Sequence, residues 1–198
     1  MSHSLFMKRN SGFTLMELLI VIGVLGILAA GLLAAIDPFE QLKKARDSNY
    51  RSGAIELLSS IQRYYANHGY FPWRNTSVTG AGTCTTDTAT VLANSSNTSS
   101  SSATVLTVGA NQDAEVVPCL TDLISDGELK STFSQGLNTT VYLSSWSKTS
   151  VRVCFSPESK SNRSDSQTMY HYDEVSNTII EGCTTEQKDA GECVQCFQ

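Results

Sequence analysis

A single carboxylate lies inside a long apolar stretch near the N-terminus of this 198-residue chain. Between Phe13 and Ile36, only Thr14 and Glu17 are markedly polar. A carboxylate placed in lipid costs roughly 3 kcal/mol or more, so such residues are rare and normally have a partner or a function. The chemistry that Glu17 offers is therefore that of a buried acid that pairs with a cation.

An amino terminus is one candidate for that cation, because the apolar stretch contains no Lys or Arg. If the chain is cut between Gly12 and Phe13, the new α-amine of Phe13 lies at the depth of Glu17. Within one chain the two residues are neighbours on a helix face. Between chains, the amine of one subunit would neutralise the carboxylate of another, and loss of either charge would leave the other buried without compensation. The pairing is then an assembly signal.

The apolar stretch that carries Glu17 is long enough to cross a hydrocarbon layer of about 30 Å as a helix. Lys8 and Arg9 precede it, and positive charge at that end favours a cytoplasmic N-terminus with the rest of the chain outside. Two alternatives are a plain membrane anchor and a secretory signal peptide cut near Ala34 and Ala35. Neither alternative gives Glu17 a role.

After Pro38 the sequence becomes amphipathic, which predicts that the same helix continues to about Asn67 and ends at Gly69 and Pro72. The apolar stripe is expected to cover a core, and the basic residues of this helix are expected to face solvent, lipid head groups or an acidic neighbour. The stripe consists of Leu42, Ala45, Ala54, Leu57, Leu58, Ile61, Tyr64 and Tyr65.

The remaining residues predict a small α+β head. Residues 73–118 are rich in Ser and Thr and are expected to form a loop, and a short helix should follow at 119–129, closed by Gly127. Four strands are expected to form an antiparallel meander within residues 139–182, with the helix stripe covering one face. Their expected ranges are Thr140–Trp146, Ser150–Phe155, Thr168–Tyr172 and Thr178–Glu181.

Six cysteines, all at or beyond residue 84, indicate a disulfide framework in an oxidising compartment. Six cysteines allow many pairings, and the preferred one joins neighbours along the chain. Cys193 and Cys196 form a C-x-x-C, which is interpreted as a structural disulfide because neither a second C-x-x-C nor a nearby His completes a zinc site. The expected pairs are Cys84 with Cys119, Cys154 with Cys183, and Cys193 with Cys196.

Other chemistry has little support in the sequence. His68 and His171 stand alone, no Ser or Cys has a recognisable base partner, and no phosphate-binding G-x-x-x-x-G-K-[ST] is present, so no enzyme is predicted. The net charge of −5 gives the chain as a whole no electrostatic reason to bind nucleic acid.

The N-terminal motif resembles the class III signal sequence of type IV pilins and type II secretion pseudopilins. The residues that carry the resemblance are Lys-Arg-Asn-Ser-Gly at 8–12, followed by Phe-Thr-Leu-Met-Glu at 13–17. The resemblance implies that a prepilin peptidase cuts after Gly12 and methylates Phe13, and that Glu17 is the assembly glutamate. Tyr-Tyr-Ala-Asn-His-Gly-Tyr-Phe-Pro at 64–72 is similar to the end of the long helix in the same family, so the likeness covers about the first 70 residues.

The family also implies sites at which the membrane helix loosens in a filament, and some pseudopilins bind calcium near the last hairpin. The candidates for loosening are Gly23, Gly26, Gly31 and Pro38. The spacing of Asp165, Asp173 and Glu174 fits no calcium loop, so these acids are interpreted as solvated turn residues and no cofactor is predicted.

The resemblance implies a pilin fold, in which a long N-terminal helix packs on an antiparallel sheet. The expected parts are a leader (1–12), a membrane and filament-core helix (13–38), an amphipathic helix (39–72) and a globular head (73–198) with a Cys-rich tail. A membrane precursor would become a helical homopolymer at the cell surface, built by a platform protein and an assembly ATPase, for adhesion, twitching motility or DNA uptake. A pseudopilin and a membrane-anchored or secreted enzyme or binding domain remain the alternatives.

Overall fold

The computed structural model describes residues 12–35, 37–74, 84, 105–145 and 147–198. The chain divides into two compact units, Met1–Phe39 and Glu40–Gln198, and we call the second unit the head. The leader residues 1–11, Trp146 and most of the Ser/Thr-rich loop lie outside the described residues.

Helix α1 (Leu15–Ala35) is apolar on every side. Its large side chains are exposed all round, from Leu15 to Leu33. Such a helix is typical of a membrane span or of a deeply buried core. In the described part of the chain, it is the one helix long and apolar enough to cross a membrane. Gly23, Gly26 and Gly31 all lie within α1.

Helix α2 (Pro38–His68) begins at a break that the sequence did not predict. A single helix was expected through this region, whereas α1 ends at Ala35 and α2 begins at Pro38. Asp37 caps α2, because its Oδ1 accepts a hydrogen bond from the N–H of Phe39 at 3.1 Å. Proline inside a helix removes a backbone hydrogen bond and clashes with the preceding turn, but it is favoured at a first helical position. The pair Asp37-Pro38 therefore starts a new helix.

The C-terminal half of α2 carries the predicted apolar stripe, and this stripe is buried. The helix ends at Gly69, which has φ +78° and donates its N–H to Tyr65 O at 2.7 Å. A left-handed residue of this kind commonly ends a helix, and glycine adopts it without strain. Leu42 and Ala45, which the predicted stripe included, are exposed, and Tyr65 is half-buried. The buried side chains of the stripe are those of Ala54, Leu57, Leu58, Ile61 and Tyr64.

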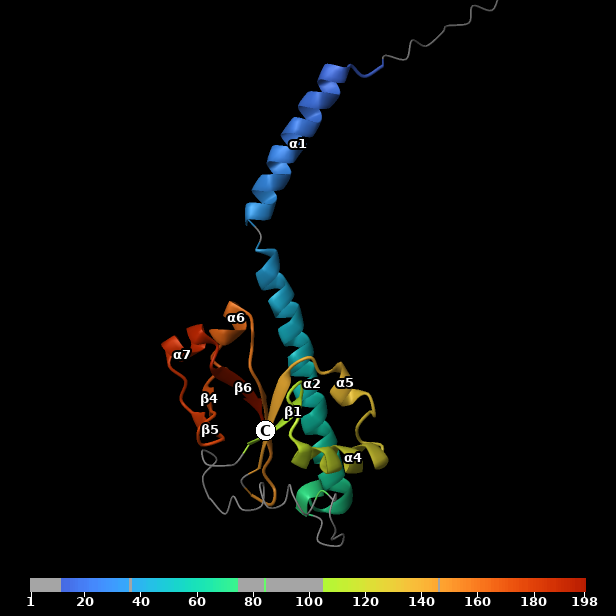
Figure 1. Ribbon diagram of the computed structural model, residues 1–198, viewed down its shortest axis with the longest axis vertical. Coiled ribbons are helices and arrows are strands. Elements are labelled where there is room, and N and C mark those ends of the chain that lie inside the picture. The colour runs from blue at the N-terminus through green and yellow to red at the C-terminus, as the bar shows by residue number, and fades with distance from the viewer. Residues whose placement is uncertain (1–11, 36, 75–83, 85–104, 146) are drawn as a thin grey trace, which may run out of the picture. The chain divides into compact units, whose positions relative to one another are not determined.

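One antiparallel sheet of six strands forms the body of the head (Figure 1). The four predicted strands are present close to their expected ranges. They are β2 (Thr140–Ser144), β3 (Arg152–Phe155), β4 (Tyr170–Asp173) and β5 (Thr178–Glu181). Two further strands, β1 (Val105–Gly109) and β6 (Cys193–Phe197), come from the expected loop and the expected tail.

The sheet is not a meander, and this part of the prediction was wrong. The strand order is β1-β2-β3-β6-β4-β5, so the last strand lies between β3 and β4. Val153 pairs with Phe197 on one side of β6, and Tyr170 pairs with Val194 on the other. The sequence pattern of a strand does not specify its neighbour, because alternation reports only which face is buried. The C-terminal residues therefore complete the sheet rather than trail from it.

Alternation along β2 and β3 divides the sheet into two faces. Val141, Leu143, Val153 and Phe155 join the core under the α2 stripe. Cys154, which lies between the last two on β3, joins a smaller cluster with Ile179 and Val194. The two faces thus bury different sets of residues, as the period of two requires.

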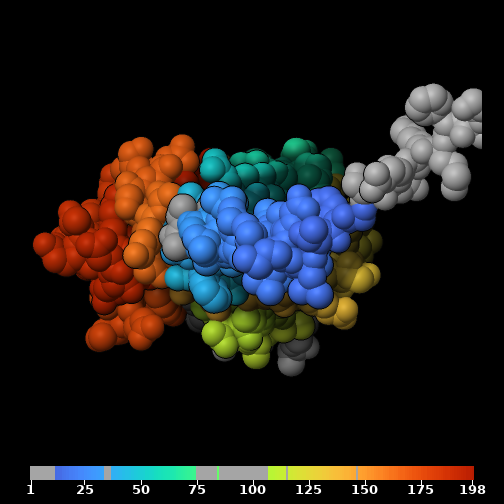
Figure 2. All heavy atoms as spheres, turned by 90° about the horizontal axis from the view of Figure 1, so that it is seen from above, coloured from blue at the N-terminus to red at the C-terminus, as the bar shows by residue number. Residues whose placement is uncertain are grey.

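Short helices surround the sheet. Helix α4 (Val117–Ser125) matches the predicted short helix, and Gly127 follows it with φ +76°. The remaining elements are η1 (Pro72–Arg74), η2 (Ala114–Val116), α5 (Phe133–Gly136), α6 (Lys160–Arg163) and α7 (Thr185–Ala190). In Figure 1 the elements α6, α7, β4 and β5, coloured orange to red, lie on the opposite side of the head from α4 and α5, and Figure 2 shows the same orange and red side from above.

Candidate processing and assembly site

The expected cleavage junction lies outside any helix. Gly12 and Phe13 have no regular secondary structure and are both exposed, and α1 begins two residues later at Leu15. Exposed, irregular backbone is the preferred substrate of proteases. The bond between Gly12 and Phe13 is therefore accessible in the uncut chain.

Thr14 determines where α1 begins. Its Oγ1 accepts a hydrogen bond from the N–H of Glu17 at 3.2 Å, and its carbonyl accepts one from Leu18 at 3.2 Å. This is the arrangement of an N-cap, which satisfies a backbone donor that the helix leaves unpaired. No role was predicted for Thr14, although the Thr-x-x-Glu spacing at 14–17 is a known signal for a helix start.

Glu17 lies in the first turn of α1, surrounded by exposed apolar side chains. A carboxylate at this position is favoured by the positive end of the helix dipole. In the uncut chain Phe13 precedes Leu15, the first helical residue of α1, and its backbone nitrogen belongs to the peptide bond with Gly12. The pairing of the Phe13 amine with Glu17 remains a prediction about the cut chain.

The six cysteines form three disulfides. Cys84 pairs with Cys119 as predicted. The other two predicted pairs were wrong, because Cys154 pairs with Cys196 and Cys183 with Cys193.

Strand β6 explains the difference in pairing. Residues three apart on a strand are about 10 Å apart and point to opposite faces, so Cys193 and Cys196 cannot bond to each other. Cys196 lies directly opposite Cys154 on β3, with the two Cα atoms 4.0 Å apart. The C-x-x-C is therefore divided between two structural disulfides.

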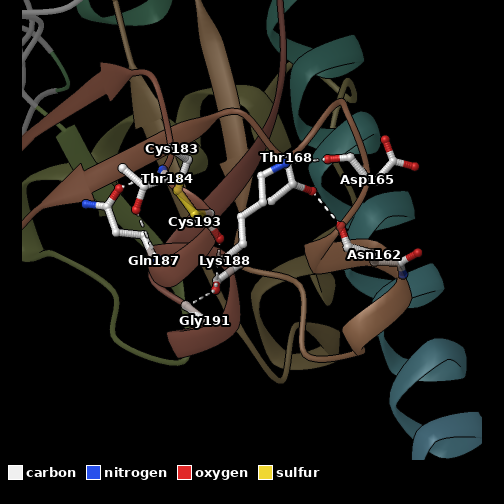
Figure 3. The surroundings of a disulfide bond; sticks show 10 residues. Asn162, Asp165, Thr168, Cys183, Thr184, Gln187, Lys188, Gly191 and Cys193 are labelled. Carbon is white, nitrogen blue, oxygen red and sulfur yellow. Dashed lines mark hydrogen bonds between the residues drawn. A yellow bond between two sulfur atoms is a disulfide. The ribbon is translucent and has the colours of Figure 1, made fainter.

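The acids considered for calcium lie in different local structures: Asp165 in a bend, Asp173 at the end of β4, and Glu174 at the start of the turn after β4. Asp165 Oδ1 accepts a hydrogen bond from Gln167 N at 2.7 Å, and Asp173 accepts bonds from Val175 N and Ser176 Oγ. Figure 3 shows Asp165 near the Cys183–Cys193 disulfide, where its carbonyl accepts a bond from Thr168 N. Among the residues that the structure describes, no cluster of three potential ligands could hold a metal.

His68 and His171 have separate surroundings. His68 Nε2 lies 3.2 Å from Asp126 Oδ2, and its ring stacks on Tyr64. His171 lies on β4, and its buried Nδ1 has no hydrogen-bond partner among the described residues.

Asp47 is the most important contact residue that the sequence analysis missed. It lies on α2, is 1% exposed, and accepts hydrogen bonds from the segment before and within α6. Its Oδ1 accepts from Glu158 N at 2.7 Å, and its Oδ2 accepts from Ser159 N, Ser159 Oγ and Asn162 Nδ2 at 3.0, 2.6 and 2.8 Å. A buried charge with this many donors is fully compensated. Asp47 thus ties the helix to the C-terminal part of the head.

The remaining polar contacts of α2 extend along the helix. Glu40 Oε1 accepts from Lys160 N, and Arg46 forms an ion pair with Glu158 at 2.7 Å. Farther along, Arg63 binds both the carboxylate and the carbonyl of Glu128. The partners of these α2 residues are more than 60 residues away in the sequence, so no local pattern could have identified them.

Comparisons with known proteins concern the N-terminal third. Residues 7–33 match the family model of the prokaryotic N-terminal methylation motif. Over 68 residues, 34% of this chain, the sequence is 43% identical to a fimbrial protein of Neisseria meningitidis serogroup B and 43% identical to a type IV major pilin protein, PilE1, of Neisseria gonorrhoeae. The chain spans 39% and 40% of the length of these relatives.

No solved structure matched the chain. The fold of the head is therefore described from its own helices, strands and disulfides. The N-terminal third of this chain carries the prokaryotic N-terminal methylation motif and is homologous to type IV pilins of Neisseria.

Proposed function

We propose that this type IV pilin-like protein is the structural subunit of a surface filament and polymerises through α1. One observation carries the proposal. An accessible Gly12–Phe13 bond immediately precedes a helix that is apolar on every side and has one carboxylate, Glu17, in its first turn. An exposed apolar surface of this extent needs lipid or other copies of itself. Both environments are supplied in turn when a membrane precursor assembles into a filament.

The pair formed by the Phe13 α-amine and the Glu17 carboxylate determines the register in which subunits align. Cleavage after Gly12 creates an α-amine on Phe13, and methylation of that amine leaves it basic. In an apolar bundle the amine of an incoming subunit and the Glu17 carboxylate of a resident one each lack water, so both gain from pairing. Apolar contact between α1 helices supplies most of the cohesion, and the pair selects one alignment. Any loosening at Gly23, Gly26, Gly31 or Pro38 belongs to this assembled state.

The proposal implies a set of partners. A prepilin peptidase cuts and methylates the precursor in the inner membrane, and a platform protein and an assembly ATPase drive extension. The filament would serve adhesion, twitching motility or DNA uptake at the cell surface. The matched relatives, which are named as a fimbrial protein and major pilins, support a filament role.

Two measurements separate this proposal from its rivals. Mass spectrometry of the mature N-terminus should find a methylated Phe13, whereas a start after Ala35 or an intact Met1 would indicate an anchored or secreted domain of another class. Electron microscopy of material sheared from cells should show long filaments, whereas a pseudopilin of a type II secretion system would form a short periplasmic structure.

The assembly step is tested by Glu17→Gln, with Glu56→Gln as the matched control on the exposed face of α2. We expect Glu17→Gln to insert in the membrane and to be cut normally but to lose filaments by about tenfold or more, because the amine of each incoming subunit is left uncompensated. Glu56→Gln should assemble like the wild type. Normal filament yield from Glu17→Gln would contradict the proposal.

A further inference from the structure

A cavity of about 440 Å³ lies on the side of the head that carries the C-terminal segment. We call it the acid cavity. It is bordered by the turn between β4 and β5, by the residues that precede β6, and by part of β2. Its carboxylates are those of Asp173, Glu174 and Glu192, and its aromatic rings are those of Tyr142 and Tyr172.

The lining of the acid cavity suits an alkyl ammonium group. The described residues that line it include His171 but no Lys or Arg, so none of its three carboxylates has a lysine or arginine partner within the cavity. The ring centroids of Tyr142 and Tyr172 lie 4.6 Å apart, and Val175 at the rim of the cavity is 97% exposed. A lysine side chain has an apolar stem and a charged end, and it can place the stem on Val175 and the rings while the ammonium approaches the carboxylates.

The tyrosines of the cavity stay neutral at physiological pH. Burial raises the pKa of Tyr142, and the nearby Tyr172 and Glu174 raise it further. Burial also raises the pKa of Tyr172. The rings therefore present neutral π-faces to a cation, and the charge of the cavity comes from its carboxylates.

Charge is separated along this chain in a way that matches the cavity. Residues 156–198 contain eight acidic and three basic residues, whereas residues 40–74, which include nearly all of α2, contain three acidic and six basic residues. A surface of one sign and a surface of the opposite sign on the same molecule are complementary between copies. A second copy of the chain therefore carries the charge that the cavity lacks.

Two lysines of α2 are the cations available for this contact. Arg46 and Arg63 have carboxylate partners within the head, and Arg51 lies over the ring of Phe197. Among the described residues, by contrast, no side-chain hydrogen bond or ion pair is formed by Lys43 or Lys44, and Lys44 is exposed. These lysines can reach another molecule without breaking a contact in their own.

We propose that the acid cavity of one subunit receives Lys43 or Lys44 from the α2 helix of a second copy. The contact rests on the proposed filament, because only a polymer repeats it between every pair of neighbours. It would join the heads of neighbouring subunits outside the apolar bundle. Together with the pair between Glu17 and the Phe13 amine, it would make two charge-based contacts that determine how neighbouring subunits align. Opposite charges at such an interface mainly set specificity and orientation.

Zero-length amine-to-carboxyl cross-linking of purified filaments tests the contact in the unmodified protein. Filaments grown from a mixture of isotopically labelled and unlabelled subunits should yield mixed-label peptides that join Lys43 or Lys44 to Asp173, Glu174 or Glu192. The same protein dispersed in detergent should not yield them. Filaments that cross-link through Lys130 but never through the α2 lysines would overturn the inference.

Charge exchange provides the genetic test. We expect Lys44→Glu and Glu174→Lys each to reduce filament yield by about tenfold, because each places like charges at the contact, and we expect the double variant to recover most of the yield. Lys130→Glu is the matched control, since it reverses an exposed lysine elsewhere on the head and should not rescue Glu174→Lys. Equal yields from the single variants and the wild type would refute the contact.

The outcome also separates this inference from the proposed function. If wild-type filaments form and Glu17→Gln abolishes them, but no α2 cross-link appears, the filament proposal stands and the acid cavity has another role. A cavity that holds a divalent cation would make filament yield sensitive to a chelator and indifferent to Lys44→Glu, which also overturns the inference. If Glu17→Gln has no effect, the filament proposal itself fails.

Discussion

Single residues carry the polar connections between α2 and the rest of the head. Asp47 contributes four hydrogen-bond acceptor contacts, and all of them go to residues 158–162, more than 100 positions away. Two of its donors, the N–H and the hydroxyl of Ser159, are buried and would otherwise have neither water nor a partner. One carboxylate therefore determines how the segment around α6 lies on the helix.

Asp47→Ala should destabilise the head by about 3 kcal/mol, because it leaves the buried N–H and hydroxyl of Ser159 and the part-buried N–H of Glu158 without an acceptor. A loss of this size lowers the melting temperature by roughly 10 °C for a domain of this length. Thermal unfolding of the purified protein measures it, and Glu56→Ala, on the exposed face of α2, should leave the melting temperature unchanged. A shift of less than about 2 °C for Asp47→Ala would show that water replaces the carboxylate.

Tyr64 makes the head sensitive to alkaline pH. Burial, together with the nearby Tyr70, Asp122 and Asp126, raises its pKa from 10.0 to about 12. A raised pKa means that the folded state holds the phenol proton of Tyr64 more tightly than the unfolded state does. The contribution of this proton to the free energy of unfolding is therefore complete below pH 10.0 and is lost as pH rises toward 12.

Tyr64→Phe should remove that part of the alkaline destabilisation, which is at most about 3 kcal/mol. Denaturant unfolding of both proteins between pH 9 and about 12 measures the difference. Part of the pH dependence should persist in the variant, since burial also raises the pKa of Tyr50 and Tyr142. Identical pH profiles would show that Tyr64 titrates as an exposed phenol.

At the scale of elements, β6 connects the two halves of the sheet. It pairs with β3 on one side and β4 on the other, and each of its cysteines bonds to a different partner. The Cys154–Cys196 disulfide joins residues 42 apart, whereas Cys183–Cys193 joins residues 10 apart. The first bond therefore constrains much more of the unfolded chain.

Removing the longer-range disulfide should cost more stability than removing the shorter one. In the chain-entropy description, Cys154→Ala/Cys196→Ala should be less stable than Cys183→Ala/Cys193→Ala by about 1 kcal/mol, and each pair should cost roughly 2–5 kcal/mol. Denaturant midpoints of the two double variants provide the comparison, and each serves as the control for the other. If the Cys183→Ala/Cys193→Ala variant were instead the less stable one, that disulfide would act mainly by stabilising the folded structure around α7 rather than by restricting the unfolded chain.

Taken as a whole, the chain consists of two units that bury very different amounts of apolar surface. Every buried hydrophobic residue among those described lies at Tyr50 or beyond, whereas the large side chains of α1 are exposed. The buried core among the described residues thus lies within the head. The proposed function uses this division, because α1 would pass from lipid to neighbouring copies while the head stays folded.

A fragment that begins at Glu40 should fold alone and remain soluble without detergent, because it keeps the full core and all three disulfides. Its melting temperature should lie within about 5 °C of that of the head in the whole protein. Circular dichroism and size-exclusion chromatography measure both properties, with the whole chain in detergent as the control. An aggregated or unfolded fragment would show that the first unit supports the core.

Features that depend on neighbouring residues could be predicted from the sequence. The apolar span, the buried stripe in the C-terminal half of α2 and four strands all follow from local periodicity and short motifs. Tertiary structure alone decided the place of β6, the partners of Cys154 and Cys183, and the ligands of Asp47. These depend on segments far apart in the chain, and the pattern of a segment reports which face it buries but not what it meets.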